Sequence, residues 1–153
     1  MISLDIYTDG SCIGNPGPGG WAYCLLLDNM SHVVSGNKEN TTNNVMELTA
    51  FLESIKRIDK IKRRVEVNIY IDSQYVINGC TKWQEGWVKR EFKTANKSPV
   101  KNQELWREIL PLYNKLNEKH RLNLYWVKAH TGNKYNEVVD SAAYNEASKI
   151  KGK

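Results

Sequence analysis

The chain has 153 residues, of which 41% are hydrophobic and 25% are charged, and its 22 Lys and Arg residues exceed its 17 Asp and Glu residues by five. This length predicts a single domain, residues 1–153, with a buried core, and the basic excess favours a polyanionic partner. The longest apolar run, Trp21 to Leu27, is too short to cross a bilayer, and the N-terminus shows no secretory signal. The three cysteines are widely spaced, which suits a reducing compartment and gives no zinc framework. We therefore expect a cytoplasmic protein with no membrane segment.

The first predicted strand begins at Ile2 and ends at Asp9. Its apolar residues Ile2, Leu4 and Ile6 alternate with Ser, Asp and Tyr, which is typical of a half-buried strand and puts Asp9 on the polar side. The glycines and prolines between residues 10 and 20 predict that the chain turns directly after Asp9. A carboxylate at such a strand end lies where open α/β sheets bind ligands, although most of these residues are ordinary solvated turn residues.

Two more strands and a helix follow. Residues 21–27 and 32–35 are predicted strands of one meander, joined by a turn at Asp28-Asn29. The capping residues 41–44 precede a helix whose apolar stripe extends from residue 48 to residue 58 and should pack on the sheet.

A second alternating strand, residues 65–71, also ends in an acid, Asp72. Strand, helix and strand in this order imply a right-handed crossover and parallel pairing. Because parallel strands end at the same edge of a sheet, Asp9 and Asp72 are predicted to be neighbours.

The second half of the chain adds two helices and one strand. Residues 105–116 have the apolar stripe of a helix, which Pro111 should kink or divide in two. Residues 122–127 are the last predicted strand, and a closing helix is expected over about 136–148. The elements together predict an α/β fold, with a five-stranded mixed sheet of three antiparallel strands followed by parallel additions, and helices packed on it.

Four acidic residues are predicted to gather at one edge of this sheet. Asp9 and Asp72 end adjacent strands, while Glu47 and Asp140 lie in the first turns of two helices. Carboxylates so close repel one another, and such a group is tolerable mainly when divalent cations neutralise it. An all-oxygen ligand set selects Mg²⁺ or Mn²⁺ over zinc, and two such ions are the usual arrangement for displacement at a phosphodiester.

Each acid also has an ordinary explanation. Glu47 lies three residues after Asn44 and could complete a capping box. Asp140 could be an acid favoured by a helix macrodipole, and Asp72 could cap the short helix that follows it. These explanations are sound one at a time, but they do not explain why every strand end and helix start at this edge has an acid.

Basic charge is concentrated between residues 82 and 101, where six basic and two acidic residues give a net charge of +4. Trp83 and Trp87 lie one helical turn apart in this segment, with Phe92 close behind. Basic residues among aromatic ones suit contact with a nucleic-acid backbone and its sugars or bases. The ordinary alternative is that both Trp residues are packed in the core beneath a basic outer face.

Five motifs in this chain resemble type 1 ribonuclease H, and the bacterial enzymes in particular, over about residues 3–148. In chain order they are Thr8-Asp9-Gly10-Ser11, Gly14-Asn15-Pro16-Gly17-Pro18-Gly19-Gly20, Thr42-Asn43-Asn44-Val45-Met46-Glu47-Leu48, Asp72-Ser73-Gln74-Tyr75-Val76 and Trp126-Val127-Lys128-Ala129-His130-Thr131-Gly132. The resemblance implies the ribonuclease H-like fold and a monomeric endonuclease. Such an enzyme hydrolyses the RNA strand of RNA–DNA hybrids and leaves 5′-phosphate and 3′-hydroxyl ends.

The resemblance also implies roles for individual residues. The four metal-binding carboxylates of the family fall on Asp9, Glu47, Asp72 and Asp140. In the family's two-magnesium scheme, for which Mn²⁺ is a possible substitute, Asp9 would bridge both ions and Asp140 would help to hold the water-activating ion. Glu47 and Asp72 would hold the other ion. His130 matches the family histidine on the loop after the last strand, which is thought to aid proton transfer or product release.

Contacts with the substrate are implied in the same way. Asn15, Asn43 and Gln74 match positions that contact the RNA strand, and amide groups suit a 2′-hydroxyl because they both donate and accept hydrogen bonds. Asn44 matches a position near the DNA strand. Asn residues next to Gly and Pro, as at Asn15, are also ordinary turn formers.

Two further regions would contact the DNA strand or the hybrid as a whole. Thr42 and Asn102 match the family's pocket for a DNA phosphate, where Asn40 replaces an Arg of related enzymes and removes a charge-assisted contact. The segment 82–101 resembles the family's basic protrusion, whose residues implied to bind hybrid are Trp83, Trp87, Lys89, Arg90 and Lys93.

Two other functions remain open at this point. One is a non-catalytic module that binds hybrid or double-stranded RNA on the same fold, which the loss of one acid would favour, but all four acids are present. The other is a nuclease or strand-transfer enzyme of the integrase type. The amide residues and the basic protrusion argue against it.

Overall fold

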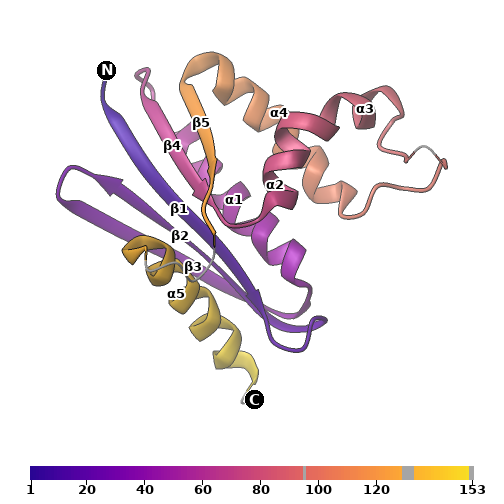
Figure 1. Ribbon diagram of the computed structural model, residues 1–153, viewed down its shortest axis with the longest axis horizontal. Coiled ribbons are helices and arrows are strands. Elements are labelled where there is room, and N and C mark those ends of the chain that lie inside the picture. Colours follow the sequence, from indigo (N-terminus) through magenta and orange to yellow (C-terminus); the bar gives the residue numbers. More distant parts are fainter. Residues whose placement is uncertain (95, 129–132, 152–153) are drawn as a thin grey trace.

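The structure is a computed structural model that describes residues 1–94, 96–128 and 133–151. Its five-stranded sheet has the strand order β3-β2-β1-β4-β5 (Figure 1). β1 is antiparallel to β2, β2 is antiparallel to β3, and β4 and β5 continue the sheet in parallel with β1. The mixed sheet predicted from the sequence is therefore confirmed. The strands are β1 (Ser3–Cys12), β2 (Gly17–Leu27), β3 (Met30–Thr41), β4 (Glu66–Ile71) and β5 (Arg121–Trp126).

Helices cover both faces of the sheet. One core joins the sheet to α1 and α4, and a smaller one, which includes Tyr7, Ala22 and Val139, lies between the sheet and α5. In Figure 1, α5 crosses the front of β1, β2 and β3, while α1 lies behind the sheet. Among the described residues, no helix has both the length and the apolar character that a membrane span requires. The helices are α1 (Asn43–Asp59), α2 (Gln74–Asn78), the π-helix η1 (Gly79–Trp83), α3 (Gln84–Lys89), α4 (Gln103–Lys119) and α5 (Lys134–Lys151).

β1 is longer and more deeply buried than the sequence predicts. The prediction of a turn directly after Asp9 is wrong, because β1 continues through Gly10 to Cys12 and stays paired with β2. The prediction of a half-buried strand is also wrong, because α5 covers the second face and leaves Asp9 only 3% exposed. Gly10 is needed where α1 passes over the strand, since a Cβ atom there would lie 2.4 Å from the backbone nitrogen of Glu47.

Other elements differ from the prediction mainly in length. β2 begins at Gly17 rather than at residue 21, β3 spans Met30–Thr41 rather than residues 32–35, and α5 extends beyond the predicted 136–148 at both ends. α4 is one continuous helix through Pro111, so its predicted division into two pieces is wrong. Pro111 lies on the exposed side of α4, where water can satisfy the carbonyl that its ring leaves without a donor.

α5 is fixed on the sheet by a close backbone approach and by a buried acid. A Cβ atom added at Gly20 of β2 would lie 2.0 Å from the carbonyl oxygen of Ala143, so only glycine allows this contact. Glu146 accepts hydrogen bonds from Ser35 Oγ at 3.1 Å and from Asn37 Nδ2 at 2.8 Å. These contacts attach α5 to β2 and β3 and so determine where its N-terminal half lies.

Replacing Gly20 by Ala should lower the free energy of unfolding by about 1–3 kcal/mol, because the new methyl group meets the backbone of α5 and the helix must shift. The matched control is Gly86→Ala in α3, where the nearest atom to the new Cβ is the far end of the Arg90 side chain at 3.1 Å. The control should be neutral or stabilise by about 0.5–1 kcal/mol, since Ala favours a helix interior. Urea unfolding of both variants measures the difference, and equal stabilities would contradict this account of the α5 contact.

Candidate active site

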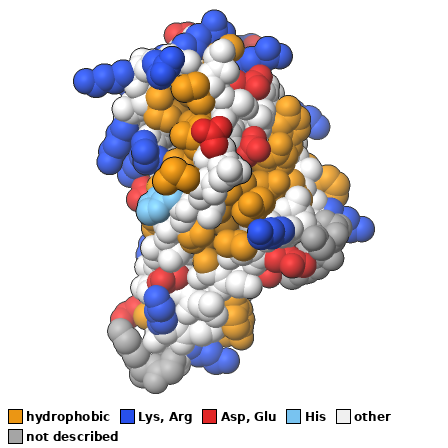
Figure 2. All heavy atoms as spheres, turned by 90° about the vertical axis from the view of Figure 1, so that its left-hand side faces the viewer, with side chains coloured by type: hydrophobic (Ala, Val, Ile, Leu, Met, Phe, Trp, Pro, Cys, Tyr) orange, Lys and Arg blue, Asp and Glu red, His pale blue; other side chains and the backbone are white. Residues whose placement is uncertain are grey.

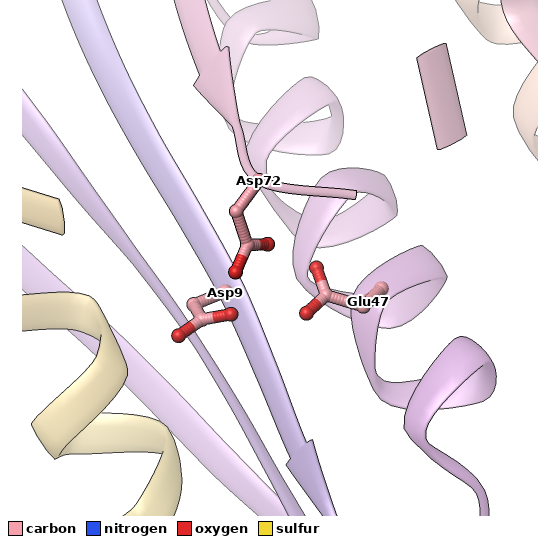
Figure 3. A group of neighbouring side chains, drawn as sticks. All are labelled: Asp9, Glu47 and Asp72. Carbon is pink, nitrogen blue, oxygen red and sulfur yellow. The ribbon is translucent and has the colours of Figure 1, made fainter. Parts of the chain in front are cut away.

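Three carboxylates from different elements converge beside the end of β4. Asp9 belongs to β1, Glu47 to the first turns of α1, and Asp72 follows β4 directly. One ligand oxygen of each lies within 4.8 Å of those of the other two. Figure 3 shows the three carboxyl groups pointing toward one another from strand, helix and strand end. The predicted proximity of Asp9 and Asp72 is confirmed.

Asp140 of α5 shares this site. It lines the same hollow of about 240 Å³ as the other three acids, together with Asn43 and Asn136. The Asp140 carboxyl also interacts with Asp9 closely enough to change the pKa of Asp9. The four predicted acids thus come from β1, α1, the end of β4 and α5. His130 lies outside the described residues.

The orientation of Glu47 excludes its ordinary explanation as part of a capping box. The N-cap of α1 is Thr42, whose Oγ1 accepts a hydrogen bond from the Val45 N–H at 3.3 Å. The Oε1 atom of Glu47 instead accepts a hydrogen bond from the Gly10 N–H of β1 at 3.0 Å. The same N–H lies 2.9 Å from Asp9 Oδ1, so one backbone group orients both carboxylates.

The surroundings of Asp72 and the position of Asp140 also argue against their ordinary explanations, a helix cap for Asp72 and a macrodipole for Asp140. Ser73, not Asp72, caps α2, because its Oγ accepts a hydrogen bond from the Val76 N–H at 3.3 Å. The carbonyl oxygen of Asp72 accepts a hydrogen bond from Trp126 Nε1 at 3.0 Å, which ties the end of β4 to β5. Asp140 lies beyond the first turn of α5, where a macrodipole would favour an acid less.

Burial and mutual repulsion change the acidity of these groups. Burial, and then the charge of Asp72, raises the pKa of Asp9 to about 8. Burial, and then the charges of Asp9 and Asp72, raises the pKa of Glu47, and burial raises that of Asp72. Without a compensating cation, the ionised forms of all three are therefore destabilised.

The donor set fits a hard divalent cation. Glu47 Oε2 and Asp72 Oδ1 are buried oxygens without a hydrogen-bond partner, which is costly unless another ligand satisfies them. The ligand atoms that converge belong to carboxylates alone, and such oxygens suit magnesium or manganese better than zinc. The geometry therefore supports metal binding by this acidic group.

The amides predicted to contact the substrate lie on elements that meet at the acidic hollow. Asn43 lines it, and Asn15 Oδ1 accepts a hydrogen bond from the Asn43 N–H at 2.9 Å, which joins the β1–β2 loop to the start of α1. Gln74 is exposed at the start of α2, two residues after Asp72, and Asn44 is exposed at the start of α1. These four side chains belong to elements that meet at the carboxylates.

The predicted phosphate pocket and basic protrusion lie on the helical side of the molecule. Asn102 occupies the N-cap position of α4 without a capping hydrogen bond from its side chain, and its Nδ2 donates to Tyr75 Oη at 3.2 Å. It lines a hollow with Lys38 and with Val45 of α1. Thr42 is exposed at the start of α1.

In Figure 1, α3 and the loop after it extend away from the sheet as a separate projection, which we call the handle, residues 82–101. The handle residues Lys89, Arg90 and Lys93 are exposed. Its two Trp residues differ, because Trp87 packs against buried Trp106 with ring centroids 5.0 Å apart, whereas Trp83 is 40% exposed. Core packing, the ordinary alternative, is therefore the observed role of Trp87.

Two residues of the site were not identified from the sequence. Asn136 is 4% exposed, lines the acidic hollow and lies four residues before Asp140, which places both on one face of α5. That spacing was a usable signal. Trp126 lies inside a quoted motif, but its contact with the Asp72 carbonyl depends on the pairing of β4 with β5, which the motif does not specify.

Comparisons with known proteins agree on one family. The RNase H family model matches residues 2–148. A protein named Ribonuclease H from Ehrlichia chaffeensis is 48% identical over 141 residues, which cover 92% of each chain. The solved structure of LC9-RNase H1, a type 1 RNase H with the type 2 active-site motif, is 27% identical with a TM-score of 0.82 and covers 97% of this chain and 74% of that one. The fold is also similar to that of LC11-RNase H1 in complex with RNA/DNA hybrid, with a TM-score of 0.64, 23% identity, and coverage of 95% of this chain and 97% of that one.

The raised pKa of Asp9 predicts how the metal-free protein responds to pH. Its value is about 8 in the folded chain against 3.8 for an ordinary Asp, so the stability this group contributes is complete below pH 3.8 and is lost as the pH rises toward 8. Replacing Asp9 by Asn should therefore stabilise the metal-free protein at pH 8, by on the order of 2 kcal/mol, and should do so much less at pH 4.

Thermal unfolding at the two pH values, with and without Mg²⁺, measures this effect. Mg²⁺ should stabilise the wild type at pH 8 and have little effect on Asp9→Asn. The control is Asp28→Asn, which changes an exposed acid in the β2–β3 turn and should respond to Mg²⁺ like the wild type. A loss of stability in metal-free Asp9→Asn at pH 8 would contradict the prediction.

Proposed function

The chain belongs to the RNase H family, and we propose from this that it is an endonuclease that hydrolyses the RNA strand of RNA–DNA hybrids. Its products would have 5′-phosphate and 3′-hydroxyl ends, and it would act as a monomer in the cytoplasm. The observation that supports this most strongly is the convergence of Asp9, Glu47, Asp72 and Asp140 from four elements on one hollow. A non-catalytic binding module would not need four acids there.

We infer that these four carboxylates hold two magnesium ions, for which manganese is a possible substitute. Ions bound there would neutralise the acids, activate the attacking water and stabilise the leaving oxygen. The protein would hold the carboxylate oxygens in place. The Gly10 N–H donates to Asp9 and Glu47, and the Trp126 indole donates to the carbonyl oxygen of Asp72. For His130 we propose proton transfer or help in product release.

Discrimination of RNA from DNA is proposed to depend on the amides around the hollow. A 2′-hydroxyl both donates and accepts hydrogen bonds, as the side chains of Asn15, Asn43 and Gln74 do. Asn44 would approach the DNA strand. The hydrogen bond from the Asn43 N–H to Asn15 Oδ1 supports a shared role, since it holds two of these residues together.

The DNA strand is proposed to contact Thr42 and Asn102 through one phosphate. Asn40 provides no charge at this pocket, but Lys38 lies two residues earlier on β3 and lines the same hollow as Asn102. A cation is therefore available beside the pocket even though the family's Arg is replaced.

The proposed activity can be tested with an end-labelled RNA–DNA hybrid and matched RNA and DNA duplexes, with and without Mg²⁺. Cutting should be confined to the RNA of the hybrid and should require the metal. Asp72→Asn and Glu47→Gln should each lower the cleavage rate by about 100-fold or more. Each removes a charged ligand of the metal ions proposed to stabilise the transition state. Asp28→Asn should retain the wild-type rate. Hybrid binding without cutting in any sample would favour the non-catalytic module instead.

The handle should supply phosphate contacts rather than chemistry. Replacing Lys89, Arg90 and Lys93 by Gln should weaken hybrid binding and reduce the slope of log affinity against log salt by about 2–3, since each cation releases about one counterion. The cleavage rate at saturating substrate should be largely kept. Titrations of hybrid over a range of salt concentrations measure the slope, and an unchanged slope would exclude the handle as a binding surface.

A further inference from the structure

A second concentration of positive charge lies outside the handle. Residues 56–64 contain six basic residues and one acid, a net charge of +5, which exceeds the +4 of the handle. This segment is the last turn of α1 and the loop that leads to β4. The net charge of the sequence does not reveal this segment, because acids elsewhere bring the chain outside the handle close to neutral.

Five of these side chains are exposed and without an ion pair among the described residues, and we call them the basic corner. They are Arg57, Lys60, Lys62, Arg63 and Arg64. Two nearby cations are neutralised, since Lys56 pairs with Glu53 and Glu108, and Lys115 pairs with Asp59 at 3.0 Å. A third, Lys119, donates through Nζ to the Ile61 carbonyl oxygen at 2.7 Å and adds to the positive charge there. The uncompensated charge therefore lies mainly in the corner, with Lys119 beside it.

Helix termini explain only part of this charge. Arg57 lies in the last turn of α1 and Lys60 is its C-cap, where a cation is favoured by the helix macrodipole. Lys62, Arg63 and Arg64 lie beyond the cap, in a loop that packs only through Ile61 and Val65. Three adjacent cations in such a loop repel one another, and no ion pair among the described residues offsets that repulsion.

The basic corner lies at the opposite end of β4 from the carboxylates. It leads into the start of β4, whereas Asp72 follows the end of that strand. Along α1, the thirteen residues from Glu47 to Lys60 correspond to about 20 Å of helix. Figure 2 shows Lys and Arg side chains gathered at the top of the molecule, the end at which β4 begins in Figure 1. A short duplex seated between the carboxylates and the handle would leave this end uncovered.

We propose that the basic corner is a second nucleic-acid contact surface, which binds the phosphates of a polynucleotide segment outside the catalytic groove, such as a single-stranded flank of the hybrid. The partner's chemical class rests on the proposed function. A polyanion with closely spaced charges fits a cluster of exposed cations without ion pairs, and neutralisation of phosphates by such cations releases counterions. No exposed aromatic ring among the described residues belongs to this corner, so it contacts the backbone and not the bases.

The test compares two variants that remove the same charge from different places. One replaces Lys62, Arg63 and Arg64 by Gln, and the other is the handle variant of Lys89, Arg90 and Lys93. Binding is measured without divalent cations, so that it does not depend on cleavage. The probes are a hybrid of about ten base pairs, the same hybrid with a single-stranded DNA extension of about twenty nucleotides, and a labelled oligoglutamate peptide.

The extension should strengthen binding to the wild type, and the corner variant should lose most of that gain, about tenfold at low salt, with a salt slope lower by about 2. The corner variant should bind the short hybrid like the wild type, while the handle variant should show the reverse pattern. A gain from the extension that survives in the corner variant, or an equal loss on both hybrids, would overturn the proposal. Binding of the peptide but not of the extension would overturn it in favour of an acidic protein partner. Absence of cleavage in the separate assay with Mg²⁺ would contradict the proposed function alone.

Discussion

The repulsion among buried carboxylates is the constraint on which the rest of this structure depends. Asp9 is 3% exposed and Glu47 is 4% exposed, and their charged forms are destabilised by both burial and proximity. A fold does not retain such a group for its stability, because two apolar side chains would cost less in the same place. A bound divalent cation would relieve this repulsion. The free energy of that relief would therefore contribute to the affinity for the metal.

Holding the carboxylates together requires close approach of the elements that bear them. α1 can lie against β1 only because Gly10 has no side chain, and the same Gly10 N–H orients Asp9 and Glu47. α5 can bring Asp140 to the site only because it packs on Gly20. These two glycines therefore act on the chemistry without contacting a substrate. Their motifs read as turn signals in the sequence, yet in the structure both lie within paired strands.

The sequence predicted the topology and the four acids because both depend on local patterns. Alternation identified β1 and β4, and the crossover rule made Asp9 and Asp72 neighbours. The extent of β1 could not be predicted in this way, since Gly10 is disfavoured in strands and is retained through contact with a helix 37 residues later. The course of α4 through Pro111 likewise depends on which side of the helix is exposed. The hydrogen bond from Trp126 to Asp72 depends on the pairing of β4 with β5, which no local pattern specifies.

Net charge illustrates the same limit of sequence reasoning. Outside residues 56–64 and 82–101 the chain has a net charge of −4, and the four acids at the site belong to this part of the chain. The molecule thus separates an acidic hollow from two basic regions, and a total of +5 conceals all three. Two divalent cations at the hollow would cancel the charge of its four carboxylates and remove their repulsion of phosphate. Metal binding would therefore act on substrate association as well as on the reaction, because a phosphodiester approaches neutralised carboxylates without repulsion.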